Sequence, residues 1–262
     1  MLNDTLFRVA RTFGLHPLQL RGQNGAHELS SWRLRLQAGA TLTHSIAGEE
    51  AVLILQNGRG TFAAGGDTWD VSRVSVFTER ATALYVPAGV PFTATAADAE
   101  LEAILISTPA PLGGNPVLAR PADVQSVERG KATFTRHVHD IFVRDAHGKR
   151  LMVGETFNPA GHWSSFPPHK HDGRNGEPRL EEVYHYRVDP PAGFGLQMMY
   201  TNDGESTVHR VVDGDAVLLP YGYHPVTSPP GYQLYYLWAM AGDERKLALY
   251  EDPAHAWITG AY

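Results

Sequence analysis

The chain has 262 residues, a formal net charge of −6 with neutral histidines, and apolar residues at 43% of its positions. This composition is that of a soluble globular protein with enough apolar residues for one large core or two smaller ones. It excludes several classes of protein. An acidic chain is a poor partner for nucleic acid, and the longest strictly aliphatic run, residues 51–55, is too short for a membrane helix. No cysteine is present for disulfides, iron–sulfur clusters or thiol catalysis.

The predicted elements are short strands separated by turns, with one short helix at residues 4–11. The 26 Gly and 18 Pro favour many turns, and the Pro/Gly-rich residues 109–116 are the predicted linker. In chain order, strands are expected at residues 31–37, 51–56, 100–107, 182–187, 196–200, 215–219 and 233–238. Short strands at this spacing predict an all-β sandwich or barrel.

The two halves of the chain resemble each other weakly. Residues 48–58 and 180–189 each form a strand that begins at a pair of glutamates, and a Pro-x-Gly turn lies downstream of each. Two copies of one β unit of about 130 residues explain this pattern. We therefore expect two domains, at residues 1–125 and 126–262.

Histidines are concentrated in the second half, where His169 and His171 follow two prolines. Residues two apart in a strand point to one face, so these imidazoles can converge on one ion. Glu182 begins the next strand, and His224 follows a Pro-x-Gly turn. Three imidazoles and one carboxylate form a transition-metal site with open positions for substrate. A second His-x-His, residues 137–139, lacks a following carboxylate strand and favours a surface or supporting role.

This order of His-x-His, Glu, a Pro-x-Gly turn and His resembles the two motifs of the cupin superfamily. More narrowly, the segments PPHKHD, EEVYHYR, GFGLQMMYT and DGDAVLLPYGYHPV are similar to the 5-deoxy-glucuronate isomerase family of inositol catabolism. The resemblance implies an all-β fold of two tandem cupin barrels (double-stranded β-helices, or jelly rolls) with few short helices. It is close over the second half, whereas the first half is similar only in length and general pattern.

The sequence departs from the general cupin pattern in two places. Ten residues separate His171 from Glu182, where most cupins have three or four, so Glu181 or Glu177 could take the ligand role instead. We favour Glu182, because its Val-Tyr continuation is similar to the ligand strand of a sister family that acts on 5-dehydro-4-deoxy-glucuronate. His224 also stands one residue closer to its turn glycine than is usual.

The first half lacks the corresponding ligands. Phe92 stands where the usual spacing would place the third histidine, and only His44 and the glutamates at residues 49–50 remain as donors. A barrel of this kind is expected to bind no metal and to serve as a scaffold or dimerisation unit.

The resemblance implies an aldose–ketose isomerase that converts 5-deoxy-glucuronate to 5-dehydro-2-deoxy-gluconate. One divalent ion, Zn or Mn ahead of Fe, Co or Ni, would act as a Lewis acid, and the sequence leaves proton transfer and hydride shift both open. Tyr184 and Gln197 are the predicted catalytic contacts. Arg174 and Arg179 are the candidates for binding the substrate carboxylate, because arginine offers forked donors.

Two other functions fit the same residues. A cupin enzyme of the dioxygenase type could use the same ligands, because ligands alone do not fix the chemistry, and a bicupin that binds sugar acids without turnover is the other alternative. We expect a homo-oligomer acting on a small sugar acid, with no nucleic-acid or membrane partner. The N-terminal residues show no secretory signal, so a cytoplasmic location is expected.

Overall fold

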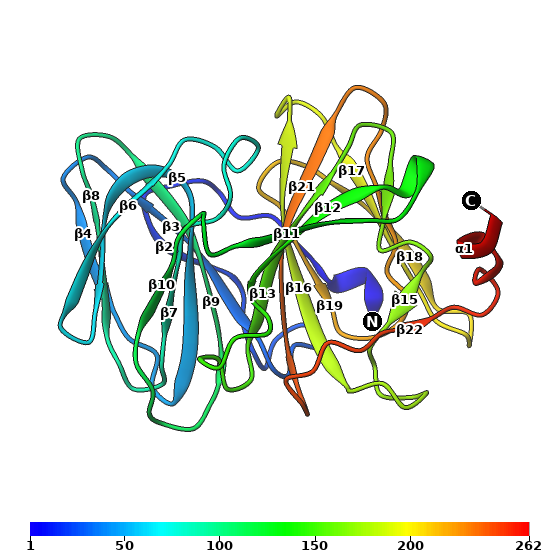
Figure 1. The fold of residues 1–262 in the computed structure, drawn as a ribbon, viewed down its shortest axis with the longest axis horizontal. Helices are drawn as coiled ribbons and strands as arrows, with labels where there is room; N and C mark the ends of the chain where they lie inside the picture. Colours follow the sequence, from blue (N-terminus) through cyan, green and yellow to red (C-terminus); the bar gives the residue numbers. More distant parts are fainter. Residues whose placement is uncertain (262) are drawn as a thin grey trace.

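Two curved β-sheet bodies lie side by side in the computed structural model, which describes residues 1–261 (Figure 1). The strands of the first body are β2 (Gly14–Gln19), β3 (Ser30–Leu36), β4 (Thr41–His44), β5 (Glu49–Ala64), β6 (Asp67–Arg73), β7 (Ala83–Val86), β8 (Phe92–Ala96), β9 (Leu101–Pro109) and β10 (Val117–Ala119). They form one nine-stranded sheet. The long strand β5 pairs with β7 and β9 in its first part and with β6 and β8 in its second, so it carries the sheet round a bend.

The second body contains three sheets. The seven-stranded sheet has the order β1 (Leu6–Phe7), β19 (Ala216–Leu219), β16 (Leu180–Asp189), β21 (Gln233–Gly242), β13 (Met152–Asn158), β12 (Arg136–Phe142) and β11 (Gln125–Arg129). The four-stranded sheet has the order β14 (Trp163–Ser164), β20 (Val226–Thr227), β17 (Gly195–Tyr200) and β18 (Ser206–Val211), and β15 (His169–Lys170) pairs with β22 (Tyr250–Glu251). The helical segments are η1 (Leu2–Asp4), η2 (Ala132–Phe134) and α1 (Trp257–Ala261).

The all-β prediction is confirmed, and each of the seven predicted strands is present. The predicted helix at residues 4–11 is wrong: η1 ends at Asp4, and β1 then adds to the edge of β19. A free strand edge offers backbone hydrogen bonds that override a weak local helix preference. No helix of residues 1–261 has the length and apolar character needed to cross a membrane.

The predicted linker, residues 109–116, lies between strands, but the chain then returns to the first body as β10. It passes to the second body only after Ala119. The pairing of β1 with β19 also brings the start of the chain to the second body. The division into residues 1–125 and 126–262 remains a prediction.

Strand alternation builds three cores from the same strands, because successive side chains point to opposite faces. In β5, Leu53 and Leu55 fill the first body, whereas Val52 and Ile54 pack against the second body. In β21, residues 234, 236, 238 and 240 fill the second body and residues 235, 237, 239 and 241 pack toward the first. The nine-stranded and seven-stranded sheets therefore share one buried apolar interface.

Two buried glutamates cross this interface in opposite directions. Glu50 on β5 accepts hydrogen bonds from the backbone N–H groups of residues 149–151 at 2.6–2.8 Å. Glu181 on β16 accepts hydrogen bonds from the backbone N–H groups of residues 27–29 at 2.6–3.1 Å. Each body thus places one carboxylate on three N–H groups of the other, which is the arrangement expected from two copies of one unit.

Phe92 belongs to the core of the first body, where it is 2% exposed. Phe92→Ala is therefore expected to lower the free energy of unfolding by about 3–5 kcal/mol and to leave the metal content unchanged. Thermal unfolding together with elemental analysis checks this. A selective loss of catalytic rate at an unchanged melting temperature would contradict it.

Candidate metal centre

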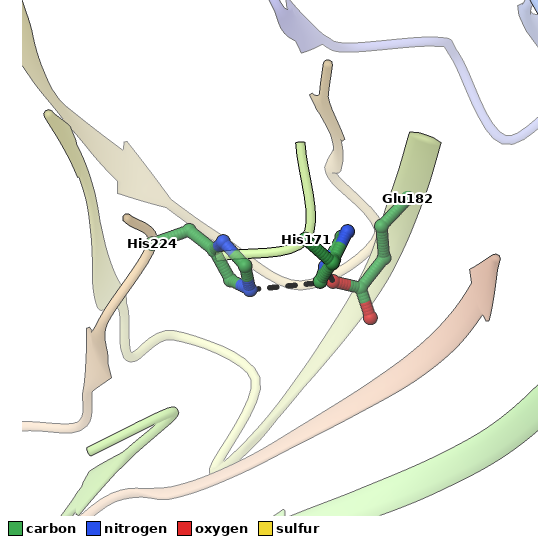
Figure 2. A group of neighbouring side chains, drawn as sticks. All are labelled: His171, Glu182 and His224. Carbon is green, nitrogen blue, oxygen red and sulfur yellow. Dashed lines mark hydrogen bonds and ion pairs between the residues drawn. The ribbon is translucent and has the colours of Figure 1, made fainter. Parts of the chain in front are cut away.

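Three buried side chains from separate segments point toward one another inside the second body (Figure 2). Glu182 lies on β16, His171 directly follows β15, and His224 lies in the turn between β19 and β20. Their nearest ligand atoms all lie within 4.8 Å of one another. Among residues 1–261 this is the one group of three or more potential metal ligands at such spacing.

Glu182 is the shared partner in this cluster. Its Oε2 lies 3.0 Å from Nε2 of His171 and 3.4 Å from Nε2 of His224. His169 lies outside the group of three but beside it, with its ring centroid 4.8 Å from that of His224. The predicted ligands are thus brought to one place, with His169 at the edge.

The tautomers of two imidazoles follow from their backbone contacts. Nδ1 of His171 donates to the carbonyl of Leu180 at 2.8 Å, and Nδ1 of His224 donates to the carbonyl of Gly222 at 3.0 Å. In the neutral rings, Nε2 then carries a lone pair directed at the Glu182 carboxylate. Nε2 of His224 is buried without a hydrogen-bond partner.

A nitrogen lone pair that faces a carboxylate oxygen is repelled by it unless a proton or a metal cation lies between them. Imidazole nitrogens oriented by backbone carbonyls, together with one carboxylate, are the donor set of transition-metal sites. The residues present therefore fit a divalent metal ion.

Burial keeps two imidazoles neutral. It is the main cause that lowers the pKa of His169 to about 3, with smaller contributions from His171 and Arg136. Burial also lowers the pKa of His224 well below its usual value. For His171, burial acts in the same direction, but contact with Glu182 raises its pKa overall. Burial raises the pKa of Glu182.

The backbone around His224 depends on a glycine. Gly222 has a φ of +85°, and a Cβ at this position would lie 2.7 Å from the carbonyl oxygen of Tyr200. A side chain here would be strained and would also clash with the backbone. The Pro-x-Gly turn thus fixes the position of His224.

The three candidate glutamate ligands, Glu177, Glu181 and Glu182, lie in different places. Neighbouring residues on β16 point to opposite faces, so Glu181 points to the first body, whereas Glu182 points to the imidazoles. Glu177 accepts a hydrogen bond from Nζ of Lys170 at 2.6 Å. Lys170 also contacts Asp172, so this lysine ties down the long insertion that precedes Glu182.

A cavity of about 560 Å³ opens from the cluster and is lined by His169, Glu182 and Tyr184, among other residues. The hydroxyl of Tyr184 lies 3.2 Å from Oγ of Ser165. Its ring packs 4.4 Å from that of Tyr236. Burial raises the pKa of Tyr184 well above its usual value, so the phenol stays a hydrogen-bond donor.

Gln197 is fully buried on β17, outside the lining of this cavity. Its Oε1 accepts a hydrogen bond from Tyr186 at 2.5 Å, and its Nε2 donates to the carbonyls of His224 and Pro225 at 3.0 and 3.2 Å. The amide therefore holds the backbone at His224. These contacts favour a positioning role over contact with substrate.

The two predicted carboxylate anchors lie elsewhere on the surface. The Arg174 side chain is 60% exposed and packs over Tyr221. The Arg179 side chain is 46% exposed and pairs with Glu28 and Asp243 at 3.1 and 2.9 Å. Neither lines the 560 Å³ cavity, so their predicted role is not supported by their placement.

Two other sets of candidates are also separate from the cluster. His137 and His139 line a different cavity, of about 350 Å³, at the boundary of the two bodies. In the first body, His44 packs against the rings of Trp32 and Phe92. Glu49 accepts hydrogen bonds from Arg21 and Ser107 of the same body, and Glu50 bonds to the backbone of the second body.

Sequence reasoning missed Arg136, which lies on the cavity wall with Val138 and Asp140. These residues alternate along β12, so the pattern was visible in the sequence. The intervening His137 and His139 lie on the other face of the strand and line the 350 Å³ cavity.

Comparison with known proteins gives consistent results. The KduI/IolB family matches residues 21–258. The 5-deoxy-glucuronate isomerase of Geobacillus kaustophilus is 37% identical over 230 residues, which is 85% of this chain and 83% of the relative. That of Bacillus subtilis is 35% identical over 232 residues, which is 86% of this chain and 85% of the relative.

Solved structures agree on the fold. An IolB-like protein from Salmonella typhimurium has a TM-score of 0.91 and 33% identity, covering 97% of this chain and 99% of the other. A mutant oxalate decarboxylase from Bacillus subtilis has a TM-score of 0.68 and 14% identity, covering 95% of this chain and 78% of the other. At that identity the likeness concerns the fold alone. The predicted cupin fold is confirmed.

Proposed function

Because this chain belongs to the KduI/IolB family, we propose that it is a metal-dependent isomerase that converts 5-deoxy-glucuronate to 5-dehydro-2-deoxy-gluconate in inositol catabolism. Relatives that are 34–37% identical carry the name 5-deoxy-glucuronate isomerase. The observation that supports metal dependence is the buried cluster of His171, Glu182 and His224 beside a cavity.

His171, His224 and Glu182 would hold the ion, and His169 is the proposed fourth donor. When bound, a divalent ion would supply Lewis-acid polarisation of adjacent carbonyl and hydroxyl oxygens of the substrate. Zn or Mn is proposed first, and Fe, Co and Ni also accept these donors.

The other residues have proposed roles in binding and orientation. Isomerisation moves the hydrogen on C2 to C1 and the hydroxyl proton on the C2 oxygen to the C1 oxygen, so it needs no external oxidant. Tyr184 lies on the cavity wall, from which its hydroxyl can donate a hydrogen bond to a substrate oxygen. Gln197 acts through the backbone of His224, which it holds in place.

Removal of the metal tests this function. Purified protein is expected to contain about one divalent ion per chain and to convert 5-deoxy-glucuronate to the ketose in an NMR assay. Chelation should abolish turnover, and adding back Zn or Mn should restore it, because the imidazoles alone lack the Lewis acid. Full turnover by metal-free protein would contradict metal dependence.

The same assay separates the alternatives. Oxygen consumption, with loss of activity in anaerobic buffer, would favour an enzyme of the dioxygenase type. Binding of sugar acids without turnover would favour a non-catalytic bicupin. The cytoplasmic location and the homo-oligomeric state remain predictions, and the proposed partner is a small-molecule sugar acid.

A further inference from the structure

One wall of the cavity beside the metal cluster carries an unusual charge pair. Arg129 on β11 and Arg136 on β12 both line the cavity, and they stand directly opposite each other in the antiparallel pair of strands. Like charges at directly opposite positions destabilise a sheet. An anion bound between the two guanidinium groups would turn this repulsion into attraction.

Among residues 1–261, neither arginine has a carboxylate within ion-pair distance. Arg144, the third arginine of the wall, differs: it is 74% exposed and lies 3.9 Å from Asp140. The charge of Arg129 also reaches Asp140, and that of Glu251 reaches Arg136, but only at longer range.

Backbone contacts orient Arg136. Its Nη1 donates to the carbonyls of Phe134 and Phe166 at 3.2 and 3.1 Å. Because one nitrogen of the planar guanidinium is held in this way, the direction of the remaining donors is fixed as well. An arginine held by carbonyls and lacking a carboxylate partner is suited to a ligand carboxylate, which can take two parallel hydrogen bonds.

The cavity also connects Arg136 to the metal cluster. Both Arg136 and His169 line it, and the charge of the guanidinium reaches the imidazole. Tyr184 and Tyr236 line the same cavity. A sugar acid whose reacting C1 and C2 lie at the imidazoles therefore has a cation available for its opposite, carboxylate end.

We propose that Arg136, assisted by Arg129, binds the carboxylate of the substrate and so makes the site specific for sugar acids over neutral sugars. This inference rests on the proposed function for the identity of the sugar acid. It assigns the anchor to an arginine on the cavity wall in place of the exposed Arg174 and Arg179.

Two unreactive probes separate carboxylate binding from chemistry. One is 5-deoxy-glucuronate reduced at C1 to the alcohol, and the other is the methyl ester of that acid, which has the same skeleton without the charge. Calorimetry with Zn-loaded protein measures the affinity of each probe, while elemental analysis and thermal unfolding check the metal content and the fold.

Arg136→Gln is expected to weaken binding of the acid by about 30-fold or more and to change binding of the ester by less than about threefold. Arg136→Lys keeps the charge but loses the paired N–H donors of the guanidinium, so we expect an intermediate loss of affinity for the acid. Arg129→Gln should give a smaller loss that is again selective for the acid. The matched control is Arg59→Gln, which removes an exposed arginine of the first body.

The proposal would be overturned if Arg136→Gln lost equal affinity for the acid and for the ester. It would also be overturned if the affinity of Arg136→Gln for the acid were unchanged. A selective loss in Arg174→Gln or Arg179→Gln in place of Arg136→Gln would overturn it as well. If Arg136→Gln does not fold, Arg136→Lys and Arg129→Gln replace it in the test. A loss of affinity for the acid but not for the ester in these variants supports the proposal, and equal losses overturn it. Turnover of 5-deoxy-glucuronate by the unaltered protein is measured separately, so a failed isomerase assay with acid-selective binding refutes the proposed function but supports the carboxylate site.

Discussion

His171→Ala and His224→Ala are each expected to lose the bound metal and to lower kcat/KM for 5-deoxy-glucuronate by about 1,000-fold or more. Each substitution removes one of two imidazoles whose Nε2 atoms face the Glu182 carboxylate. A Lewis acid contributes several kcal/mol to such a reaction, and each 1.4 kcal/mol or so corresponds to a factor of ten in rate. Elemental analysis and the NMR assay measure the two losses side by side.

A matched control is His147→Ala, which removes an exposed imidazole from the same half of the chain. It should keep both metal and turnover. His169→Ala is expected to follow the ligand variants, because its ring lies beside that of His224. Turnover by a metal-free His169→Ala/His171→Ala double variant would refute the mechanism, and an unfolded variant is recognised by its thermal transition.

Much of the metal cluster follows from strand alternation alone. The sequence places Glu182 and Tyr184 on one face of a strand, and both line the cavity. It also places Lys170 opposite its two neighbouring histidines, and Lys170 does turn to Asp172 and Glu177. Alternation is a local property, so it can be read from residue order without knowledge of the strand partners.

Features that depend on the register between strands could not be predicted in this way. The pairing of Arg129 with Arg136 requires the register of β11 and β12, which no local pattern specifies. The amide of Gln197 looked like a ligand contact because it is polar among apolar neighbours, but its partners come from the turn at His224. A buried polar side chain can form its hydrogen bonds with backbone groups as readily as with a ligand.

The contact between the two bodies also could not be predicted from the sequence. Arg73 on β6 and Glu155 on β13 come from different bodies, and both side chains are 0% exposed. They form a bidentate pair with N–O distances of 2.7 and 3.0 Å. Glu155 also accepts a hydrogen bond from Tyr235 at 2.6 Å. Arg73 also donates hydrogen bonds to the carbonyls of Leu55 and Glu79, whereas its Nε is buried without a partner.

Arg73→Met is therefore expected to lower the free energy of unfolding by about 3–5 kcal/mol, because it leaves the Glu155 carboxylate buried without a cation. For a chain of this size the melting temperature should fall by roughly 8–15 °C. Urea and thermal unfolding measure the loss. The metal content should not change, because this pair does not belong to the metal cluster.

A second substitution identifies the cause of the loss. In Arg73→Met/Glu155→Gln no charge remains buried, and the amide oxygen can still accept the hydrogen bond of Tyr235, so most of the lost stability should return. The control is Arg59→Gln, which breaks the surface pair of Arg59 with Asp98, whose side chains are 64% and 71% exposed. Exposed pairs contribute little, so its melting temperature should equal that of the unaltered protein. If the double variant were no more stable than Arg73→Met, the loss would come from the hydrogen bonds of Arg73 to Leu55 and Glu79, and the buried charge would not be its cause.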